Sequence, residues 1–293
     1  MLDLLIASTP LFLTGVFIFG LLIGSFLNVV ILRLPARLEH EWRCQCIELL
    51  AIESPDTKPS DPPLSIMLSR SQCPECGHLI RSYENVPLLS YLFLKGRCSS
   101  CKAPISPRYP SIEATTAILF LAVAMHFGPN LQLLAALGLT AILITLTVID
   151  FDHQLLPDDL TMILLWSGLF ISLFFIFTDP VSAIIGAMAG YLSLWIVYQL
   201  FRLLTGKEGM GYGDFKLLAA LGAWLGWQML PLIILLSSLV GAVIGLIMIG
   251  LKRHKSSQPM PFGPFIALAG WIAMMWGDQI IDTYLRSSGL GNL

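Results

Sequence analysis

Long runs of apolar residues dominate the chain. Five of them contain no Asp, Glu, Lys or Arg, and these runs are residues 4–32, 160–178, 180–201, 217–251 and 256–277. A sixth run, 114–149, contains His126 as its one ionisable residue. About 20 apolar residues in a helix are enough to cross a hydrocarbon layer of about 30 Å. Each run therefore predicts at least one membrane-spanning helix.

Two of the runs are too long for one crossing. The 35 residues of 217–251 would form a helix of roughly 52 Å, well beyond the thickness of the hydrocarbon layer. Gly226 and Pro231 in the stretch GWQMLP break this run, and FGPN at 127–130 divides 114–149. The pattern predicts eight spans, near residues 8–32, 112–127, 131–149, 160–178, 180–202, 215–227, 231–250 and 262–280. The sixth span is short, as expected for a partial span buried among its neighbours.

Composition agrees with this pattern. Hydrophobic residues make up 56% of the chain, charged residues make up 12%, and the mean hydropathy is +0.77. These values lie outside the range of soluble domains. The predicted fold class is therefore an all-α polytopic membrane protein surrounded by lipid, and no nucleic-acid partner is expected.

The basic residues predict how the chain is oriented. Ten of the seventeen Lys and Arg residues lie between Arg33 and Arg108, counting both ends, and basic residues concentrate in cytosolic loops. If that segment is cytosolic, alternation through eight spans leaves only Arg286 outside. No basic stretch precedes the first apolar run, so residues 1–33 are expected to be an anchor helix with its N-terminus outside.

The predicted cytosolic segment, residues 34–110, separates the first helix from a membrane domain at 111–293. It contains two Cys-x-x-Cys pairs, CPEC and CSSC, with 21 residues between them. Four thiolates at this spacing predict a tetrahedral Zn²⁺ site, which would hold together a zinc-ribbon-like segment that has little core. The four ligands are Cys73, Cys76, Cys98 and Cys101. Redox pairs or reduced thiols are the alternative, although the cytosol disfavours disulfides.

The predicted zinc is structural, because four thiolates leave no open position for water. Cys44 and Cys46 have poor geometry for joining the same site and are interpreted as incidental. Catalytic groups are therefore expected among the carboxylates, since charges at membrane depth are costly and usually functional. Asp179 and Asp278 fall at outer span ends, as boundary residues do. The cytosolic side has Asp150, Asp152, Asp158, Asp159, Glu208 and Asp214.

Asp150 and Asp214 are the strongest candidates for a catalytic pair. Asp150 ends a long apolar run and Asp214 begins the short sixth span, so both fall at the cytosolic boundary. Two carboxylates held close together share a proton, which allows one to activate water while the other protonates a peptide carbonyl. Asp152 is the rival for the first position. His153 is interpreted as an interfacial residue.

Several motifs resemble those of the type IV prepilin peptidases. They are GSFLNVVILRLP (24–35), the two Cys-x-x-Cys pairs, RYPSIE (108–113), IDFDHQLLPD (149–158) and GMGYGDFKLLAALGAW (209–224). The resemblance covers nearly the whole chain. It implies that Asp150, followed after six residues by Pro157 and Asp158, is one catalytic residue. Asp214, in the Gly-x-Gly-Asp motif, is implied to be the other.

The resemblance also implies the substrates and the location. The enzyme would lie in the bacterial inner membrane with its active site facing the cytosol. It would cleave type IV prepilins and type II secretion pseudopilins after the Gly that ends a basic leader. It would then methylate the new N-terminal amine with S-adenosylmethionine as donor. Glu84, Arg108 and Glu113 are places where the methyl donor is expected, although Arg108 and Glu113 also suit an interfacial anchor.

Other interpretations of these residues stay open. Gly24, Ser25 and Asn28 are better explained as a helix-packing stripe than as part of a site. An ion-coupled transporter would use Asp150 and Asp214 as a relay, although both fall at one boundary and not at the midplane. A noncatalytic scaffold that recruits secretion components through the cysteine segment would leave both carboxylates unexplained.

Overall fold

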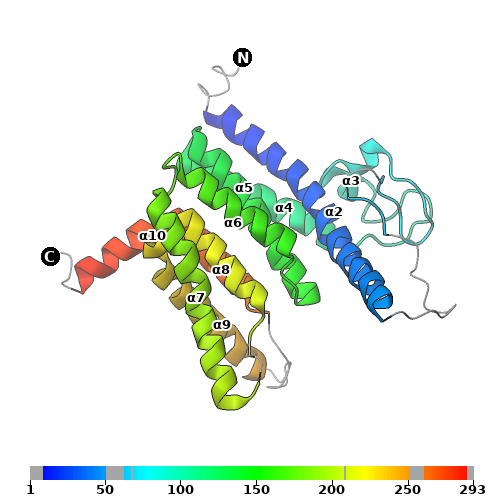
Figure 1. Ribbon diagram of the computed structural model, residues 1–293. Helices are drawn as coiled ribbons and strands as arrows, with labels where there is room; N and C mark the ends of the chain where they lie inside the picture. The colour runs from blue at the N-terminus through cyan, green and yellow to red at the C-terminus, as the bar shows by residue number, and fades with distance from the viewer. Residues whose placement is uncertain (1–8, 51–62, 67–68, 208, 251–260, 289–293) are drawn as a thin grey trace. The chain divides into compact units, whose positions relative to one another are not determined.

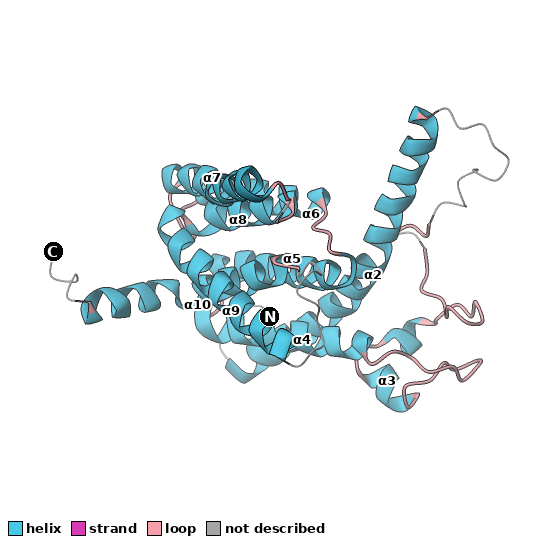
Figure 2. Ribbon diagram, turned by 90° about the horizontal axis from the view of Figure 1, so that it is seen from below, coloured by secondary structure: helices cyan, strands magenta, loops and turns pink. Residues whose placement is uncertain are grey.

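The computed structural model describes residues 9–50, 63–66, 69–207, 209–250 and 261–288. These residues divide into two compact units, one up to Met125 and one from His126. Helices make up most of both units, and the described residues contain isolated β-bridges but no strand (Figures 1 and 2). Glu208 and the basic residues at 252–255 lie outside the described part.

The first unit contains the longest helix, α2 (Thr9–Leu49), and most of α4 (Arg108–Phe127). Between them lie the short helices η2 (Ser82–Asn85) and α3 (Leu89–Phe93). The predicted end of the first helix near residue 32 is wrong, because α2 continues through Pro35 to Leu49. Residues 36–49 are mostly good helix formers, so the change from apolar to polar sequence ends the membrane run without ending the helix.

The packing stripe predicted on α2 is confirmed. A Cβ atom at Gly20 would lie 2.7 Å from the Ala117 Cα, and one at Gly24 would lie 2.7 Å from the Glu113 Cα. The two glycines, four residues apart, thus let the backbones of α2 and α4 approach closely. Asn28 adds a polar link, because its Nδ2 donates to the Tyr109 carbonyl oxygen at 3.1 Å.

The second unit contains six helices in the described residues: α5 (Leu131–His153), α6 (Asp158–Ser172), α7 (Pro180–Thr205), α8 (Tyr212–Leu225), α9 (Leu230–Gly250) and α10 (Gly263–Ser287). A short turn, η3 (Trp227–Met229), connects α8 to α9 at the predicted break. The eight predicted spans thus correspond to α2 and α4–α10. Six of these helices in the described residues are long and apolar enough to cross a membrane.

The two shorter helices are α6 and α8, with 15 and 14 residues. At about 1.5 Å per residue they reach only about 21–23 Å, less than a full crossing. The short sixth span is confirmed in α8. The fourth span is shorter than predicted, because α6 ends at Ser172 and the backbone of Phe175 adopts a φ of +53°. The run of aromatic residues there contains no glycine or proline to mark this end.

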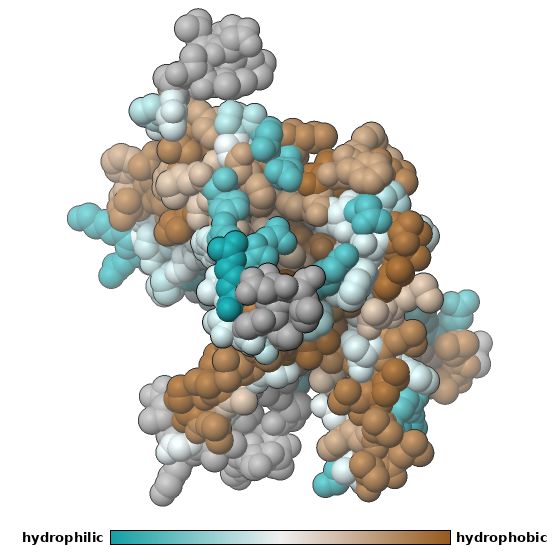
Figure 3. All heavy atoms as spheres, turned by 90° about the vertical axis from the view of Figure 1, so that its left-hand side faces the viewer, coloured by the Kyte–Doolittle hydropathy of each residue, from teal (hydrophilic) through white to brown (hydrophobic). Residues whose placement is uncertain are grey.

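The core of the second unit forms around α8. Every residue from Asp214 to Leu225 is buried except Lys216, and α8 packs against α6, α7 and α10. Gly186 of α7 meets Gly222 of α8 so closely that a Cβ on either residue would lie 2.2 Å from the carbonyl oxygen of the other. By contrast, apolar side chains cover much of the outer face in Figure 3, as expected for helices in contact with lipid.

Candidate functional site

The two predicted catalytic carboxylates are both buried, and each lies at the end of a helix. Asp150 lies in the last turn of α5 and is 5% exposed, and Asp214 lies in the first turn of α8 and is 6% exposed. The carboxyl groups are close enough to interact electrostatically. Burying two interacting carboxylates in one apolar environment costs free energy, so such a pair indicates a functional site.

The rival Asp152 is exposed, as is His153. Two residues correspond to about 200° of rotation on a helix, so Asp150 and Asp152 point to nearly opposite sides of α5. The structure therefore brings Asp150, and not Asp152, to a buried position where it interacts with Asp214. Gln154 ends α5 with a φ of +52°, and its N–H donates to the Asp150 carbonyl oxygen at 2.9 Å.

The loop after α5 places Leu156 against the glycines next to the two aspartates. This side chain is buried and fills the space beside two glycines. A Cβ at Gly213 would lie 2.7 Å from the Leu156 Cβ, and a Cβ at Gly263 would lie 3.1 Å from its Cδ atoms. Gly211, by contrast, has open space, with only Asp214 Oδ2 as near as 3.9 Å. None of the three glycines of GMGYG has a positive φ, so close approach to Phe201 and Leu156 explains Gly209 and Gly213, and left-handed backbone explains none of them.

An ion pair fixes the start of α6 beside the pair of aspartates. Lys216 Nζ lies 2.6 Å from Asp158 Oδ1, and Lys216 is two residues beyond Asp214. Asp158 belongs to the Pro-Asp step of the sequence motif, and Asp159 beside it is exposed. Asp158 therefore connects two helices, and it does not join the buried carboxylates.

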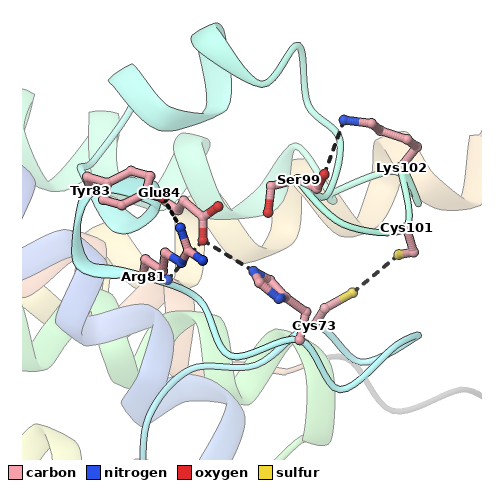
Figure 4. A network of polar contacts seen from close by, with 8 residues as sticks. Cys73, Arg81, Tyr83, Glu84, Ser99, Cys101 and Lys102 are labelled. Atoms are coloured by element: carbon pink, nitrogen blue, oxygen red, sulfur yellow. Dashed lines mark hydrogen bonds and ion pairs between the residues drawn. The ribbon is translucent and has the colours of Figure 1, made fainter.

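The four predicted metal ligands come together in the first unit. The sulfur atoms of Cys73, Cys76, Cys98 and Cys101 all lie within 4.8 Å of one another. Cys73 Sγ and Cys101 Sγ are 3.8 Å apart, and Figure 4 shows them facing each other. A tetrahedral zinc with Zn–S bonds of about 2.3 Å requires sulfur atoms about 3.8 Å apart. The residues present therefore fit a zinc ion.

The two Cys-x-x-Cys turns have the same backbone design. In the first turn the Cys73 N–H donates to the His78 carbonyl oxygen, and in the second the Cys98 N–H donates to that of Ala103, each at 2.9 Å. The residue four positions after the first cysteine has a positive φ in both turns, Gly77 at +69° and Lys102 at +62°. Each turn therefore presents two sulfur atoms to one side.

The two thiols of the second turn differ, because the neighbouring cysteine side chains and burial raise the pKa of Cys101 to about 12 whereas backbone N–H groups favour the thiolate of Cys98. The N–H groups of Cys101 and Ser100 lower the pKa of Cys98 to about 6. A thiolate, and not a thiol, is the form that binds zinc. Cys44 and Cys46 are both free on α2 and are not part of this cluster.

A polar network supports the cysteine cluster (Figure 4). Glu84 Oε2 accepts the Arg81 N–H at 2.9 Å and lies 3.4 Å from His78 Nε2, which connects it to the first turn. The Arg81 N–H and the Ser99 side chain lower the pKa of the Glu84 carboxyl group. Arg81 in turn donates from Nη1 to the Tyr83 hydroxyl at 2.7 Å. The network therefore holds a carboxylate beside the two cysteine turns.

Comparisons with known proteins cover both units. The model of the bacterial peptidase A24 N-terminal domain matches residues 18–127, and that of the type IV leader peptidase family matches residues 137–246. A prepilin leader peptidase/N-methyltransferase of Aeromonas hydrophila is 57% identical over 94% of this chain and 95% of its own length. The chain belongs to the type IV leader peptidase family. Members from Pseudomonas aeruginosa and Legionella pneumophila with the same name are 55% and 46% identical, over 97% of this chain and 97% and 99% of their own lengths.

No solved structure matches the chain. The two family models separate the two candidate sites: the N-terminal match contains the cysteine cluster, and the leader peptidase match contains both buried aspartates. Helix α10, which begins at Gly263, lies beyond the second match.

Two of the residues considered for the methyl-donor site, Glu84 and Glu113, form hydrogen bonds within the first unit. Glu113 is buried, and its Oε2 accepts the Leu88 N–H at 2.9 Å. That N–H belongs to a tight turn in which Leu88 has a φ of +57°, so Glu113 stabilises an unusual backbone conformation. Glu84 belongs to the network beside the cysteines. The expected methyl-donor site at these residues stays a prediction.

Proposed function

We propose that this chain is a membrane-embedded aspartic endopeptidase that removes the basic leader of type IV prepilins and type II secretion pseudopilins, and then methylates the new N-terminus. Support for prepilins as substrates comes from the names of the relatives, which are prepilin leader peptidase/N-methyltransferases over nearly their full length, and the pseudopilins are part of the proposal. The observation that carries the proteolytic mechanism is the pair of buried, interacting carboxylates of Asp150 and Asp214.

The pair performs hydrolysis by exchanging protons with water and the peptide. The ionised member of the pair accepts a proton from water as the water oxygen attacks the carbonyl carbon of the last leader glycine. The protonated member donates its proton to the carbonyl oxygen. The tetrahedral intermediate then returns a hydroxyl proton to the pair as its carbonyl re-forms. The C–N bond breaks, the leaving amine takes the other proton from the pair, and the pair is left with one proton as at the start. No covalent enzyme intermediate is needed.

The position of the pair suits a bond at the membrane boundary. Both carboxylates lie at helix ends, on the side where Lys216 pairs with Asp158. We place this side in the cytosol and the protein in the bacterial inner membrane, on the distribution of basic residues. The substrate's basic leader would stay in the cytosol while its apolar helix stays in the bilayer.

The cysteine cluster is proposed to hold a structural zinc through Cys73, Cys76, Cys98 and Cys101. When bound, zinc would cross-link the two turns of a segment that has few buried apolar residues. S-adenosylmethionine would supply the methyl group, which passes from its sulfonium to the nitrogen of the new N-terminus as that amine loses a proton.

The function is tested with purified protein in detergent and a synthetic prepilin. Mass spectrometry should show release of the leader after its last glycine. With S-adenosylmethionine added, the mature product should gain the mass of one methyl group in place of a hydrogen. A matched prepilin with a bulky residue in place of that glycine should stay intact. An intact wild-type prepilin under the same conditions would contradict the proposal.

A further inference from the structure

Helix α10 begins against the carboxyl group of Asp150. Gly263 is the first residue of α10, and its backbone N–H faces this carboxyl group. A Cβ added to Gly263 would lie 2.6 Å from Asp150 Oδ2, closer than real Cβ contacts. Oδ2 is buried and has no hydrogen-bond partner among the described residues. The space beside this oxygen therefore exists because residue 263 is a glycine.

The backbone around Gly263 leaves this N–H available. The first N–H groups of a helix have no acceptor within the helix, and together they carry a partial positive charge. Phe265 and Ile266 donate to the Phe262 carbonyl oxygen, and Pro264 has no N–H. Among the N–H groups in the first turn of α10, the Gly263 N–H is therefore the one that faces the buried carboxyl group of Asp150.

Helix α10 also joins the two helices that carry the aspartates. It packs against both α5 and α8, whereas α5 and α8 make hardly any direct contact with each other. Along α10, Gly270 lies against Leu221 of α8, and Trp271 donates from Nε1 to the Thr140 hydroxyl of α5 at 3.1 Å. The separation of Asp150 from Asp214 therefore depends on where α10 lies.

We propose that Gly263 is a positioning residue for the aspartate pair. It has no Cβ, so the start of α10 can approach Asp150, and its N–H then orients the carboxyl group toward Asp214. The effect on catalysis rests on the proposed function. The contact between Gly263 and the Asp150 carboxyl group rests on the structure alone. It assigns a role in the site to α10, which lies outside the matched leader peptidase region.

The catalytic consequence is tested by Gly263→Ala on a synthetic prepilin. A displacement of about 1 Å at a catalytic group costs about 100-fold in rate, so we expect kcat to fall by about that factor while KM changes little. Gly138→Ala is the matched control, because Gly138 is a glycine of α5 with nothing within 4 Å of an added Cβ. A kcat for Gly263→Ala equal to that of the control would overturn the proposal.

The contact itself is tested by thermal unfolding, which needs no activity. Gly263→Ala should lower the melting temperature of the parent protein. In an Asp150→Ala background, which removes the colliding oxygen, the same substitution should lower it by less. An equal loss in both backgrounds would overturn the proposal.

Leu156 provides a second background, because its Cδ atoms lie 3.1 Å from the same added Cβ. Leu156→Ala should relieve the loss less than Asp150→Ala does, and it should not restore kcat to Gly263→Ala. Full restoration by Leu156→Ala would show that the collision is with the loop and not with the carboxyl group. A parent protein that cleaves no prepilin would contradict the proposed function, and the unfolding result would still decide the contact.

Discussion

At the scale of single residues, burial distinguishes the two proposed catalytic aspartates from the other aspartates near the same helix ends. Asp150 and Asp214 are buried and interact with each other. Asp152 and Asp159, which follow Asp150 closely in the sequence, are exposed. Asp179 has a structural role. It precedes α7, and its Oδ1 accepts the N–H groups of Val181 and Ser182 at 3.0 Å each. A carboxylate in this position stabilises a helix start.

The cap formed by Asp179 makes the start of α7 sensitive to acid. The Ser182 side chain and N–H lower the pKa of Asp179 below that of an unfolded chain. A lowered folded pKa means that the stabilisation is fully present above about pH 4 and is lost as the pH falls through the folded value. We expect Asp179→Ala to lower the melting temperature at pH 7. The difference from the parent should shrink as the pH falls below about 4.

Asp179→Asn is the matched control, because an amide oxygen can cap the helix without titrating. Its melting temperature should stay close to that of the parent at pH 7. A constant difference between the parent and Asp179→Ala down to acid pH would contradict the assigned cap.

The four-cysteine cluster leads to a prediction about the zinc content of single-cysteine variants. Purified protein should contain about one zinc per chain, and Cys73→Ser should lose most of it because a four-thiolate site tolerates the loss of a ligand poorly. Metal content is measured by elemental analysis. Cys46→Ser, an exposed cysteine outside the cluster, is the matched control and should retain its zinc. Equal zinc contents in Cys73→Ser and Cys46→Ser would contradict the four-cysteine site.

At the scale of helices, the unusual elements are the two short ones, α6 and α8. Both begin on the side of the aspartate pair, and the ion pair Asp158–Lys216 connects the first residue of α6 to the fifth residue of α8. Trp224, near the end of α8, connects α8 to the middle of α6, because its Nε1 donates to the Leu164 carbonyl oxygen at 2.8 Å. A buried helix too short to cross the bilayer can start at a site inside the protein, as α8 does with Asp214.

The Asp158–Lys216 pair predicts a measurable coupling between α6 and α8. Because Asp158 is 64% exposed, the pair is expected to contribute only about 0.2–1 kcal/mol to stability, and less at high salt. Asp158→Asn and Lys216→Met should each lower the melting temperature slightly, and the double variant should lose less than the sum. Asp159→Asn, at the exposed neighbour, is the control. Additive losses in the double variant would show that the pair does not couple the helices.

The sequence allowed the prediction of helix number better than of helix ends. The apolar runs and the breaks at FGPN and GWQMLP predicted eight helices, because burial in lipid demands long apolar segments. The end of α2 was missed, since Arg33 ends the apolar run but the helix continues through Pro35 to Leu49. The early end of α6 has no local signal, and just beyond it the Ile176 carbonyl oxygen accepts a hydrogen bond from Gln132, a residue distant in the sequence.

The candidate site was predictable only in part. Asp150 and Asp214 stood out because carboxylates at the ends of apolar runs are rare and costly. Leu156, Lys216 and Gly263 were not found as parts of the site. An apolar loop residue, an interfacial lysine and a glycine at a helix start are common in membrane proteins. Their role depends on which helices approach each other, and a single sequence does not contain this information.

At the scale of the whole molecule, the two units divide the chemistry. The first unit holds the cysteine cluster and matches the N-terminal domain of the peptidase family, and the second holds both aspartates and the leader peptidase match. Apolar side chains exposed on the helices agree with a multi-pass membrane protein. The central claim is that proteolysis depends on the two buried carboxylates of the second unit.

Cleavage of a synthetic prepilin by Asp150→Asn and Asp214→Asn measures this claim most directly. Each amide keeps nearly the size of the carboxyl group but exchanges no proton, so each variant should lose nearly all cleavage. Asp152→Asn is the matched control, because it changes an exposed aspartate two residues away, and it should cleave at about the rate of the parent. Full cleavage by Asp150→Asn or Asp214→Asn would contradict the aspartate pair.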